Sequence, residues 1–457
     1  MAVTPICEGS LEAPTRHPLA WQTAAFHDPH ALAAELERVF EICHGCRRCV
    51  NLCQAFPTLF DLVDAAETLE VDGVAKADYG KVVDQCYLCD LCYMTKCPYV
   101  PPHEWNLDFP HLMLRAKAVK FRQGQTRLRD RVLSRTDAVG TLAGIPVVNA
   151  VVNATRTNAL GRKVIANLLG IHPDATLPAY SSRPFRTRER GRIRHAAAGQ
   201  AAGPTTGRVA LFTTCYGNYN EPELNADLIA VFEHSALVVT LPASEQCCGM
   251  PRMELGDLAA VKAARDANIP ILKGLVDAGW DIVAVVPSCV LMFKQVLPLM
   301  FPEDDEVHAV KARIFDPFEY LLLRHRQGLL ATDFKQSLGT VVYQASCHQR
   351  VQNIGQKTRE VLALVPNTTV EIIERCSGHD GTYAVKQEFH DAAMKIARPV
   401  AKRVEQAAPD HFGSDCPMAG AHIAHALGRD GQQKHPLSLL RMAYGIDTHP
   451  QGASPCR

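Results

Sequence analysis

Seventeen cysteines dominate the chemistry available to this 457-residue sequence. Eight of them form two tight groups, Cys43-x2-Cys46-x2-Cys49-x3-Cys53 and Cys86-x2-Cys89-x2-Cys92-x4-Cys97. The first spacing matches the bacterial ferredoxin pattern, and the second repeats it with one extra residue. Three closely spaced thiolates can bind three irons of one cube, while the fourth cysteine is directed to a different cube. We therefore expect one 4Fe-4S cluster on Cys43, Cys46, Cys49 and Cys97, and another on Cys86, Cys89, Cys92 and Cys53.

The residues around these cysteines predict the surrounding fold. Zinc is the alternative metal, but zinc sites usually combine two separated Cys-x2-Cys pairs, so three thiols in series favour iron. Gln54 stands where a proline usually follows, and 32 residues separate Cys53 from Cys86, too many for a compact β-hairpin ferredoxin. Apolar residues recur here at spacings of three and four, which is typical of helices. We expect a helical ferredoxin domain over residues 1–110.

Further cysteines follow apolar, strand-like runs in the second half of the chain. GRVALFTTCYGN, SALVVTLPASEQCCG and DIVAVVPSC contain Cys215, Cys247, Cys248 and Cys289. GTVVYQASC, TTVEIIERCSG and HFGSDCP repeat this order with Cys347, Cys376 and Cys416, at offsets of 132, 129 and 127 residues. This internal duplication places the thiols at the carboxyl ends of strands, where open α/β sheets form their ligand sites. Both copies are therefore predicted metal sites.

The two copies differ by one thiol. EQCCG in the first copy contains Cys248, whereas ERCSG in the second contains Ser377 at the matching position. The first copy supplies four thiols, one for each iron of an ordinary cube, and the second supplies three. The second copy therefore needs a fourth ligand or holds an iron with an open position. His379 is the nearest candidate and Asp380 the next, and a Cys3His zinc site is an alternative because zinc accepts that ligand set.

Composition limits the classes of function. The 48 basic and 48 acidic residues give a formal net charge of zero, which argues against a general nucleic-acid binder. The first 21 residues lack the charged start and apolar core of a signal peptide, and no uninterrupted apolar run reaches transmembrane length. We therefore expect a cytoplasmic protein. In that reducing compartment clustered thiols more often hold metal than form disulfides.

Composition also divides the chain into four parts. Residues 1–110 contain the ferredoxin-like groups, residues 111–206 form a basic helical segment and a linker, and residues 207–330 and 331–457 are two α/β repeats. Within the second part, Arg115–Arg135 carries eight basic residues against one acid, and Ala138–Thr155 is uncharged. This combination fits either peripheral contact with an anionic membrane surface, on its inner face, or an acidic protein partner.

Together these motifs resemble a known family. The ferredoxin pair followed by C…CCG…C and a second copy is similar to the C subunit of anaerobic glycerol-3-phosphate dehydrogenase and its relatives, whose carboxyl half resembles the B subunit of heterodisulfide reductase. CSGHDGTY with the downstream SDCPMAG resembles a branch described alongside rubrerythrin. The resemblance covers nearly the whole chain from about residue 40. It implies an iron–sulfur electron carrier that links a partner dehydrogenase, or a rubrerythrin-like redox protein, to a quinone or another acceptor.

Departures from the family narrow these implications. The full CCG pattern ends in Cys-x2-Cys, but here Met292 stands three residues after Cys289. The first copy is thus one thiol short of the five-thiolate site that acts on disulfides in the heterodisulfide reductase relatives. We expect two 4Fe-4S clusters, with one or two further clusters, or one zinc, in the duplicated domain. The expected function is an electron-transfer subunit of an oxidoreductase, and the alternative is a catalytic reductase acting on a disulfide or peroxide-derived substrate at the second copy.

Overall fold

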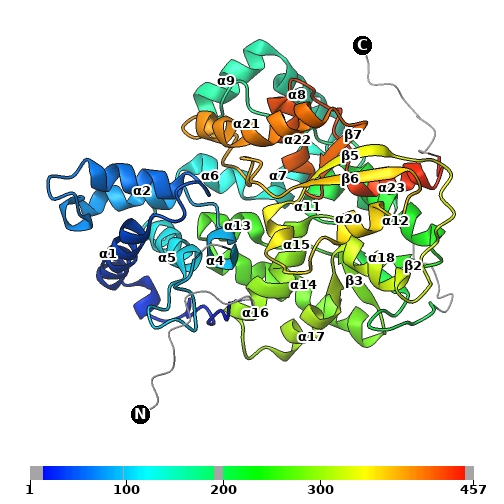
Figure 1. Cartoon of the computed structure of the whole chain (residues 1–457), viewed down its shortest axis with the longest axis horizontal. Coiled ribbons are helices and arrows are strands. Elements are labelled where there is room, and N and C mark those ends of the chain that lie inside the picture. Colours follow the sequence, from blue (N-terminus) through cyan, green and yellow to red (C-terminus); the bar gives the residue numbers. More distant parts are fainter. Residues whose placement is uncertain (1–13, 96, 190–198, 448–457) are drawn as a thin grey trace.

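Helices come first and two α/β repeats follow in this protein, for which the computed structural model describes residues 14–95, 97–189 and 199–447. Figure 1 shows the helices of the amino-terminal part at one side of the molecule, in blue and cyan. The first repeat, in green, and the second, in yellow to red, fill most of the remainder. In the described residues the first strand begins at Arg208. The predicted α/β class is therefore confirmed.

The amino-terminal part is helical. Its first long helix begins where the Asp28 side chain accepts a hydrogen bond from the His30 N–H and Pro29 takes the first helical position. Apolar residues every three or four positions bury one face of this helix. The helices agree with the sequence analysis, while their ferredoxin character stays a prediction. They are α1 Pro29–Cys46, α2 Ala55–Asp64, α3 Tyr79–Asp84, α4 Leu91–Thr95 and α5 Phe109–Arg122.

The middle part is also helical. It contains α6 Leu128–Leu133, α7 Thr136–Ala143, α8 Pro146–Thr157, α9 Ala159–Leu169 and α10 Phe185–Arg188. No single helix in the described ranges has the length and apolarity to cross a membrane. The helices α7 and α8 have that length and apolarity only when taken together, and the pair is bent by 105°. The predicted linker covers residues 186–207, and its first residues belong to α10, which buries Phe185. Residues 190–198 of the linker lie outside the described residues.

The first repeat contains a parallel sheet with the strand order β2-β1-β3-β4. Its central strands are almost wholly buried, as expected for a parallel sheet covered by helices on both faces. The two-residue strand β4 was not predicted, because so short a run shows no periodicity. The elements are β1 Arg208–Phe212, α11 Cys215–Tyr219, α12 Pro222–His234, β2 Val238–Thr240, α13 Met250–Leu255, α14 Leu258–Asp277, β3 Asp281–Ala284, α15 Pro287–Leu291, α16 Leu297–Met300, α17 Asp305–Arg313, β4 Ile314–Phe315 and α18 Pro317–His325.

The second repeat has the parallel strand order β6-β5-β7. Its central strand β5 corresponds to β1 of the first repeat. The flanking strands β6 and β7 correspond to β2 and β3. The predicted internal duplication is thus confirmed. The elements are β5 Gly339–Gln344, α19 Cys347–Arg350, α20 Lys357–Leu362, β6 Thr368–Ile373, α21 His390–Ala407, β7 His411–Ser414, α22 Pro417–Ala426 and α23 Pro436–Ala443.

Buried polar contacts hold the two repeats together. Where α23 packs against α12, Arg441 Nη1 donates a hydrogen bond to Asp227 Oδ1 at 2.7 Å. Where α15 meets α19, Ser288 Oγ lies 2.7 Å from His348 Nδ1. Breaking a buried charge pair leaves an uncompensated charge, so the first contact strongly favours this arrangement of the repeats. The second contact lies beside Cys289 and Cys347 in sequence, and it therefore fixes the two cysteine sites relative to each other.

Candidate metal-cluster sites

The first ferredoxin group, consisting of Cys43, Cys46, Cys49 and Cys97, gathers at the end of α1. Cys43 and Cys46 lie in the last turn of this helix, and Cys97 follows α4. Burial raises the pKa of the Cys43 thiol well above its usual value, and three neighbouring thiols raise it further, those of Cys97, Cys49 and Cys46. Such effects require short separations. The structure therefore brings these four thiols together although Cys97 is distant in sequence.

The second ferredoxin group, consisting of Cys86, Cys89, Cys92 and Cys53, surrounds α4. Burial raises the pKa of Cys92 well above its usual value, and Cys86, Cys53 and Cys49 raise it further. Burial also raises the pKa of Cys53, with Cys86 as the next contribution. The Cys53 thiol, which precedes α2 in sequence, thus lies near the loop before α4. Because Cys49 belongs to the first ferredoxin group, the two groups adjoin.

The first-repeat site consists of Cys215, Cys247, Cys248 and Cys289. These residues come from the start of α11, the loop before α13, and α15, all beyond the carboxyl ends of strands. Hydrogen bonds from Cys215 and Cys248 hold the pKa of Cys247 well below its usual value, and Cys289 hydrogen-bonds with Cys248 in turn. Gly249 follows with φ of 100°, a conformation that glycine adopts readily. Four thiols therefore meet here in one continuous set.

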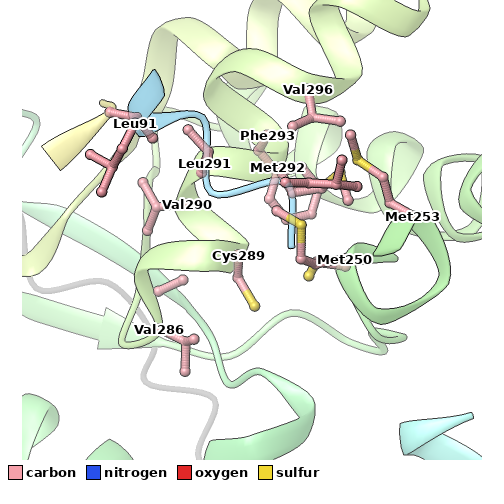
Figure 2. Close-up of a cluster of buried hydrophobic side chains, with 14 of the residues drawn as sticks. Leu91, Met250, Met253, Val286, Cys289, Val290, Leu291, Met292, Phe293 and Val296 are labelled. Atoms are coloured by element: carbon pink, nitrogen blue, oxygen red, sulfur yellow. The ribbon is translucent and has the colours of Figure 1, made fainter. Parts of the chain in front are cut away.

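Apolar side chains surround this site. Figure 2 shows Cys289 in α15 with Val286 and Val290 on either side along the chain and Met250 nearby. Met292, at the position where the related pattern has a further cysteine, is fully buried in the same apolar cluster. A thioether has no thiolate charge, so this residue packs as a core side chain. Among the described residues, the first-repeat site therefore offers four thiols.

The second-repeat site consists of Cys347, Cys376 and Cys416. Cys347 begins α19 after β5, Cys376 follows β6, and Cys416 caps α22 after β7. Burial raises the pKa of Cys347 well above its usual value, and three nearby groups raise it further, namely Asp380, Cys376 and Cys416. Ser377, at the place of the missing thiol, is buried. The structure thus brings together the three thiols that the duplication predicts.

The two candidate fourth ligands face different surroundings. His379 Nε2 and Asp380 Oδ2 are both buried, and neither has a hydrogen-bond partner in the described structure. Burial lowers the pKa of His379 to about 3, and His422, whose ring centroid lies 6.0 Å away, lowers it further. Asp380, by contrast, raises the pKa of Cys376, as it does that of Cys347. Both residues therefore place a buried, unpartnered polar atom within four positions of Cys376 in sequence.

The second ferredoxin group meets the second-repeat site directly. Burial raises the pKa of Cys89 well above its usual value, and the next contribution comes from Cys347. The ring of Tyr87, between two cysteines of that group, lies 4.3 Å from the ring of Tyr383 in the second repeat. These contacts join thiols that are far apart in sequence.

A histidine ties this junction to the first repeat. His348, next to Cys347, lies with Nε2 3.4 Å from the Leu88 carbonyl in the loop of the second ferredoxin group. Its Nδ1 is 2.7 Å from Ser288 Oγ in the first repeat. One imidazole of the second repeat thus contacts two other parts of the chain that carry cysteine sites.

Two ionisable residues that the sequence analysis did not single out lie between the sites. Lys117 on α5 donates from Nζ to the Cys86 carbonyl at 2.5 Å. Burial raises the pKa of Glu254 to about 7, while Lys117 and Lys386 oppose this rise. Glu254 also acts on Asp380, whose pKa is raised first by burial. A single lysine and a single glutamate on helices belong to no motif, so no signal in the sequence identifies them.

The grouped thiols are donors of the kind that metal clusters take. In the described ranges, no three His, Cys, Asp or Glu side chains are placed to hold one metal ion. In a cubane cluster each thiolate binds a different iron. Thiolates are also the ligands that iron–sulfur clusters select. The donor set of each group therefore fits an iron–sulfur cluster.

A pocket of about 720 Å³ lies beside the first-repeat site and is lined in part by Cys215. Its other walls come from α7, the start of α8, α10 and the loop before Cys247. Burial raises the pKa of Glu245 in this lining to about 7, and Arg186 Nη1, 3.4 Å from Glu245 Oε2, opposes the rise. The volume is typical of a small-molecule site. A molecule in this pocket would lie against Cys215 of the first-repeat site.

A protein-family comparison matches both repeats. The cysteine-rich domain called CCG matches residues 209–294 and again residues 341–424. The two ranges contain all the thiols of the first-repeat and second-repeat sites. The chain therefore contains two copies of this cysteine-rich domain.

Several known proteins are homologous to this chain. The C subunit of anaerobic glycerol-3-phosphate dehydrogenase from Escherichia coli (strain K12) is 27% identical, over 73% of this chain and 81% of the relative. The B subunit of fumarate reductase (CoM/CoB) from Methanothermobacter marburgensis is 26% identical, over 52% and 47%. Lactate utilization protein A from Bacillus cytotoxicus is 28% identical, over 46% and 87%. Two of these relatives are named as subunits of a dehydrogenase and a reductase.

The crossing of ligands between the two ferredoxin groups gives a testable prediction. Replacing Cys97 with Ser removes a thiol that lies beside Cys43, so the cluster of the first ferredoxin group should be lost or altered. The electron paramagnetic resonance spectrum of the reduced Cys97→Ser protein should match the spectrum of Cys46→Ser. The spectrum of the matched control, Cys53→Ser, should instead match the spectrum of Cys89→Ser. A Cys97→Ser spectrum that matches Cys89→Ser would show that the ligands do not cross.

Proposed function

We propose that this chain is an iron–sulfur electron-transfer subunit of an oxidoreductase. The observation that carries the proposal is the junction at which Cys347 of the second-repeat site raises the pKa of Cys89 in the second ferredoxin group. Passing single electrons requires clusters close together, and adjoining thiol groups meet that requirement. The dehydrogenase and reductase subunits among the homologues support this role over the alternative of a catalytic reductase at the second-repeat site.

Electrostatic effects between neighbouring sites support one order for the relay. Cys49 affects the pKa of Cys92 and so links the two ferredoxin groups, and the junction described above continues to the second-repeat site. Cys416 of that site then contributes to the raised pKa of Tyr216, the neighbour of Cys215, although burial is the larger cause. The order is therefore first ferredoxin group, second ferredoxin group, second-repeat site and first-repeat site. Bound 4Fe-4S clusters would supply the one-electron chemistry, and the protein positions them.

The ends of this relay indicate the partners. The first ferredoxin group includes the last turn of α1, and α1 lies with α2 at one side of the molecule (Figure 1), where a partner dehydrogenase or a rubrerythrin-like redox protein would donate electrons. At the other end, the pocket beside Cys215 suits a quinone as the acceptor. Ile145 and Pro146 supply apolar lining, and Arg186 supplies a donor for a carbonyl oxygen. The pocket and the bend between α7 and α8 share Ile145 and Pro146.

The surface next to this pocket is unusually apolar. Nine of the twelve exposed large apolar side chains in the described residues lie between Leu128 and Leu168. Val147 is 76% exposed, Leu160 73% and Leu168 77%, which is typical of an interaction surface. Basic residues outnumber acids there, which favours an anionic surface. We infer peripheral contact with the inner face of a membrane through α8 and α9, which lie together at one edge of the molecule in Figure 1.

Metal content tests the electron-transfer proposal. Filling both ferredoxin groups and the first-repeat site should give about twelve irons per chain, rising towards sixteen if the second-repeat site also holds a cube, because each cube contains four irons. Iron, sulfide and zinc should be measured on protein purified without oxygen. Fewer than about eight irons after reconstitution would contradict the assignment of the ferredoxin groups. One zinc per chain with no fall in iron would assign zinc to the second-repeat site.

Vesicle binding tests the membrane contact. Replacing Leu160 and Leu168 together with Gln should weaken binding to vesicles that contain phosphatidylglycerol about tenfold or more, because each buried leucine contributes about 1.5–3 kcal/mol. Leu69→Gln is the matched control, since Leu69 is 61% exposed on another part of the chain. This variant should bind the vesicles as the unmodified protein does. Co-sedimentation with the vesicles measures the binding of both variants. Equal binding by the double variant and the control, or no binding by the unmodified protein, would reject the membrane surface and favour a protein partner.

A further inference from the structure

The loop of the second ferredoxin group, residues 86–92, is held from outside. Leu88 and Asp90 have positive φ values of 58° and 60°, which residues other than glycine seldom adopt. Such residues persist only where the surrounding structure holds them. The Leu88 side chain is buried in the core, and the Asp90 carboxylate pairs with Arg16, whose Nη1 lies 2.6 Å from Oδ2. Contacts with other parts of the chain therefore determine the course of this loop.

Helix α5 supplies one of these contacts through Lys117. The Lys117 Nζ donates a hydrogen bond to the Cys86 carbonyl at 2.5 Å. The backbone of α5 is fixed at the same residue, because a Cβ atom at Gly256, which follows α13, would lie 2.4 Å from the Lys117 carbonyl carbon. Gly256 also has a φ of 86°, so glycine is favoured there on both counts. The first repeat thus places Lys117 against the start of the loop.

The second repeat supplies a further donor through His348. Its Nε2 lies 3.4 Å from the Leu88 carbonyl. A carbonyl only accepts, so Nε2 carries the proton and Nδ1 accepts from Ser288 Oγ at 2.7 Å. In a planar trans peptide the N–H points opposite to the C=O. The two donors thus fix the directions of the Tyr87 and Cys89 N–H groups, and backbone N–H groups tune a cluster when they bond to its sulfurs.

We propose that Lys117 is a positioning residue for the second ferredoxin cluster and raises the midpoint potential of that cluster. This inference rests on the proposed electron-transfer function. The lysine ammonium group holds the Cys86 peptide and brings a positive charge beside a ligand that is only 8% exposed, where charges act more strongly than in water. Reduction adds one negative charge to the cluster, so a nearby positive charge favours the reduced form.

The charge of Lys117 gives the relay a direction. One electron leaves the reduced first ferredoxin cluster, which is oxidised, and it reduces the second ferredoxin cluster. Lys117 stabilises the product of this step and so favours electron flow from the first group to the second. The electron then resides next to the second repeat, where the ring of Tyr87 lies 4.3 Å from the ring of Tyr383.

Redox titration followed by electron paramagnetic resonance tests this role on the full chain purified without oxygen. The signal of the second ferredoxin cluster is the one that Cys89→Ser loses. In Lys117→Met the ratio of reduced to oxidised cluster at a fixed applied potential should fall about tenfold, which corresponds to about 59 mV for one electron. Lys117→Arg keeps a positively charged donor and should retain the potential of the unmodified protein.

The same helix offers a matched control. Lys120 Nζ lies 2.7 Å from the Asp84 carboxylate in a partly exposed ion pair. Solvent screens such a pair, so Lys120→Met should leave the potential of the second ferredoxin cluster unchanged.

The outcomes separate this inference from the proposed function. An unchanged potential in Lys117→Met would overturn it, as would an equal fall in Lys117→Arg, because arginine keeps the charge. If Lys117→Met fails to fold, Lys117→Gln decides by the same titration, since glutamine keeps a donor and loses the charge. Absence of both ferredoxin signals from the unmodified protein would instead reject the electron-transfer function. Their presence, with equal potentials in the unmodified protein and the uncharged variant, would reject only the role of Lys117.

Discussion

The contact between the loop of the second ferredoxin group and the second repeat is the feature on which the remaining sites depend. There Cys89 approaches Cys347, and His348 bridges the Leu88 carbonyl and Ser288 of the first repeat. Buried thiolates are unfavourable unless a metal compensates their charge, so burial raises the pKa of Cys89 and Cys347, and a bound metal would have to displace their protons. Once this junction forms, the helical part and both repeats hold a fixed relation, and the order of the sites follows from it.

Duplication followed by divergence explains why the two repeats are not equivalent. Both present thiols at the carboxyl ends of parallel strands, with the same strand order around β1 and β5. The first repeat keeps paired cysteines and fills the place of a further thiol with the core residue Met292. The second has lost one thiol to Ser377 and lies beside the second ferredoxin group. One repeat thus borders a pocket, whereas the other adjoins the second ferredoxin group.

Much of this arrangement could be predicted from the sequence, because cysteine spacing and repeated strand patterns are local signals. The grouping of Cys97 with Cys43 follows from ferredoxin spacing, and the strands ending near Cys215 and Cys347 follow from apolar runs. Other features depend on three-dimensional packing. Lys117 and Glu254 belong to no motif, and β4 is too short to show a pattern. His379 and Asp380 are neighbours in sequence, and each has a buried atom without a hydrogen-bond partner in the described residues, so sequence spacing does not choose between them.

Magnetic coupling between clusters tests the junction most directly. Electron paramagnetic resonance and its relaxation should be recorded on the fully reduced protein and on Cys347→Ser, in which the second-repeat cluster is disrupted. The relay predicts that the second ferredoxin cluster relaxes faster, with a broader signal, in the unmodified protein than in this variant, because a paramagnetic neighbour lies close to it. An identical signal and relaxation rate in the two proteins, with the second-repeat cluster shown to be present and reduced in the first, would contradict the relay.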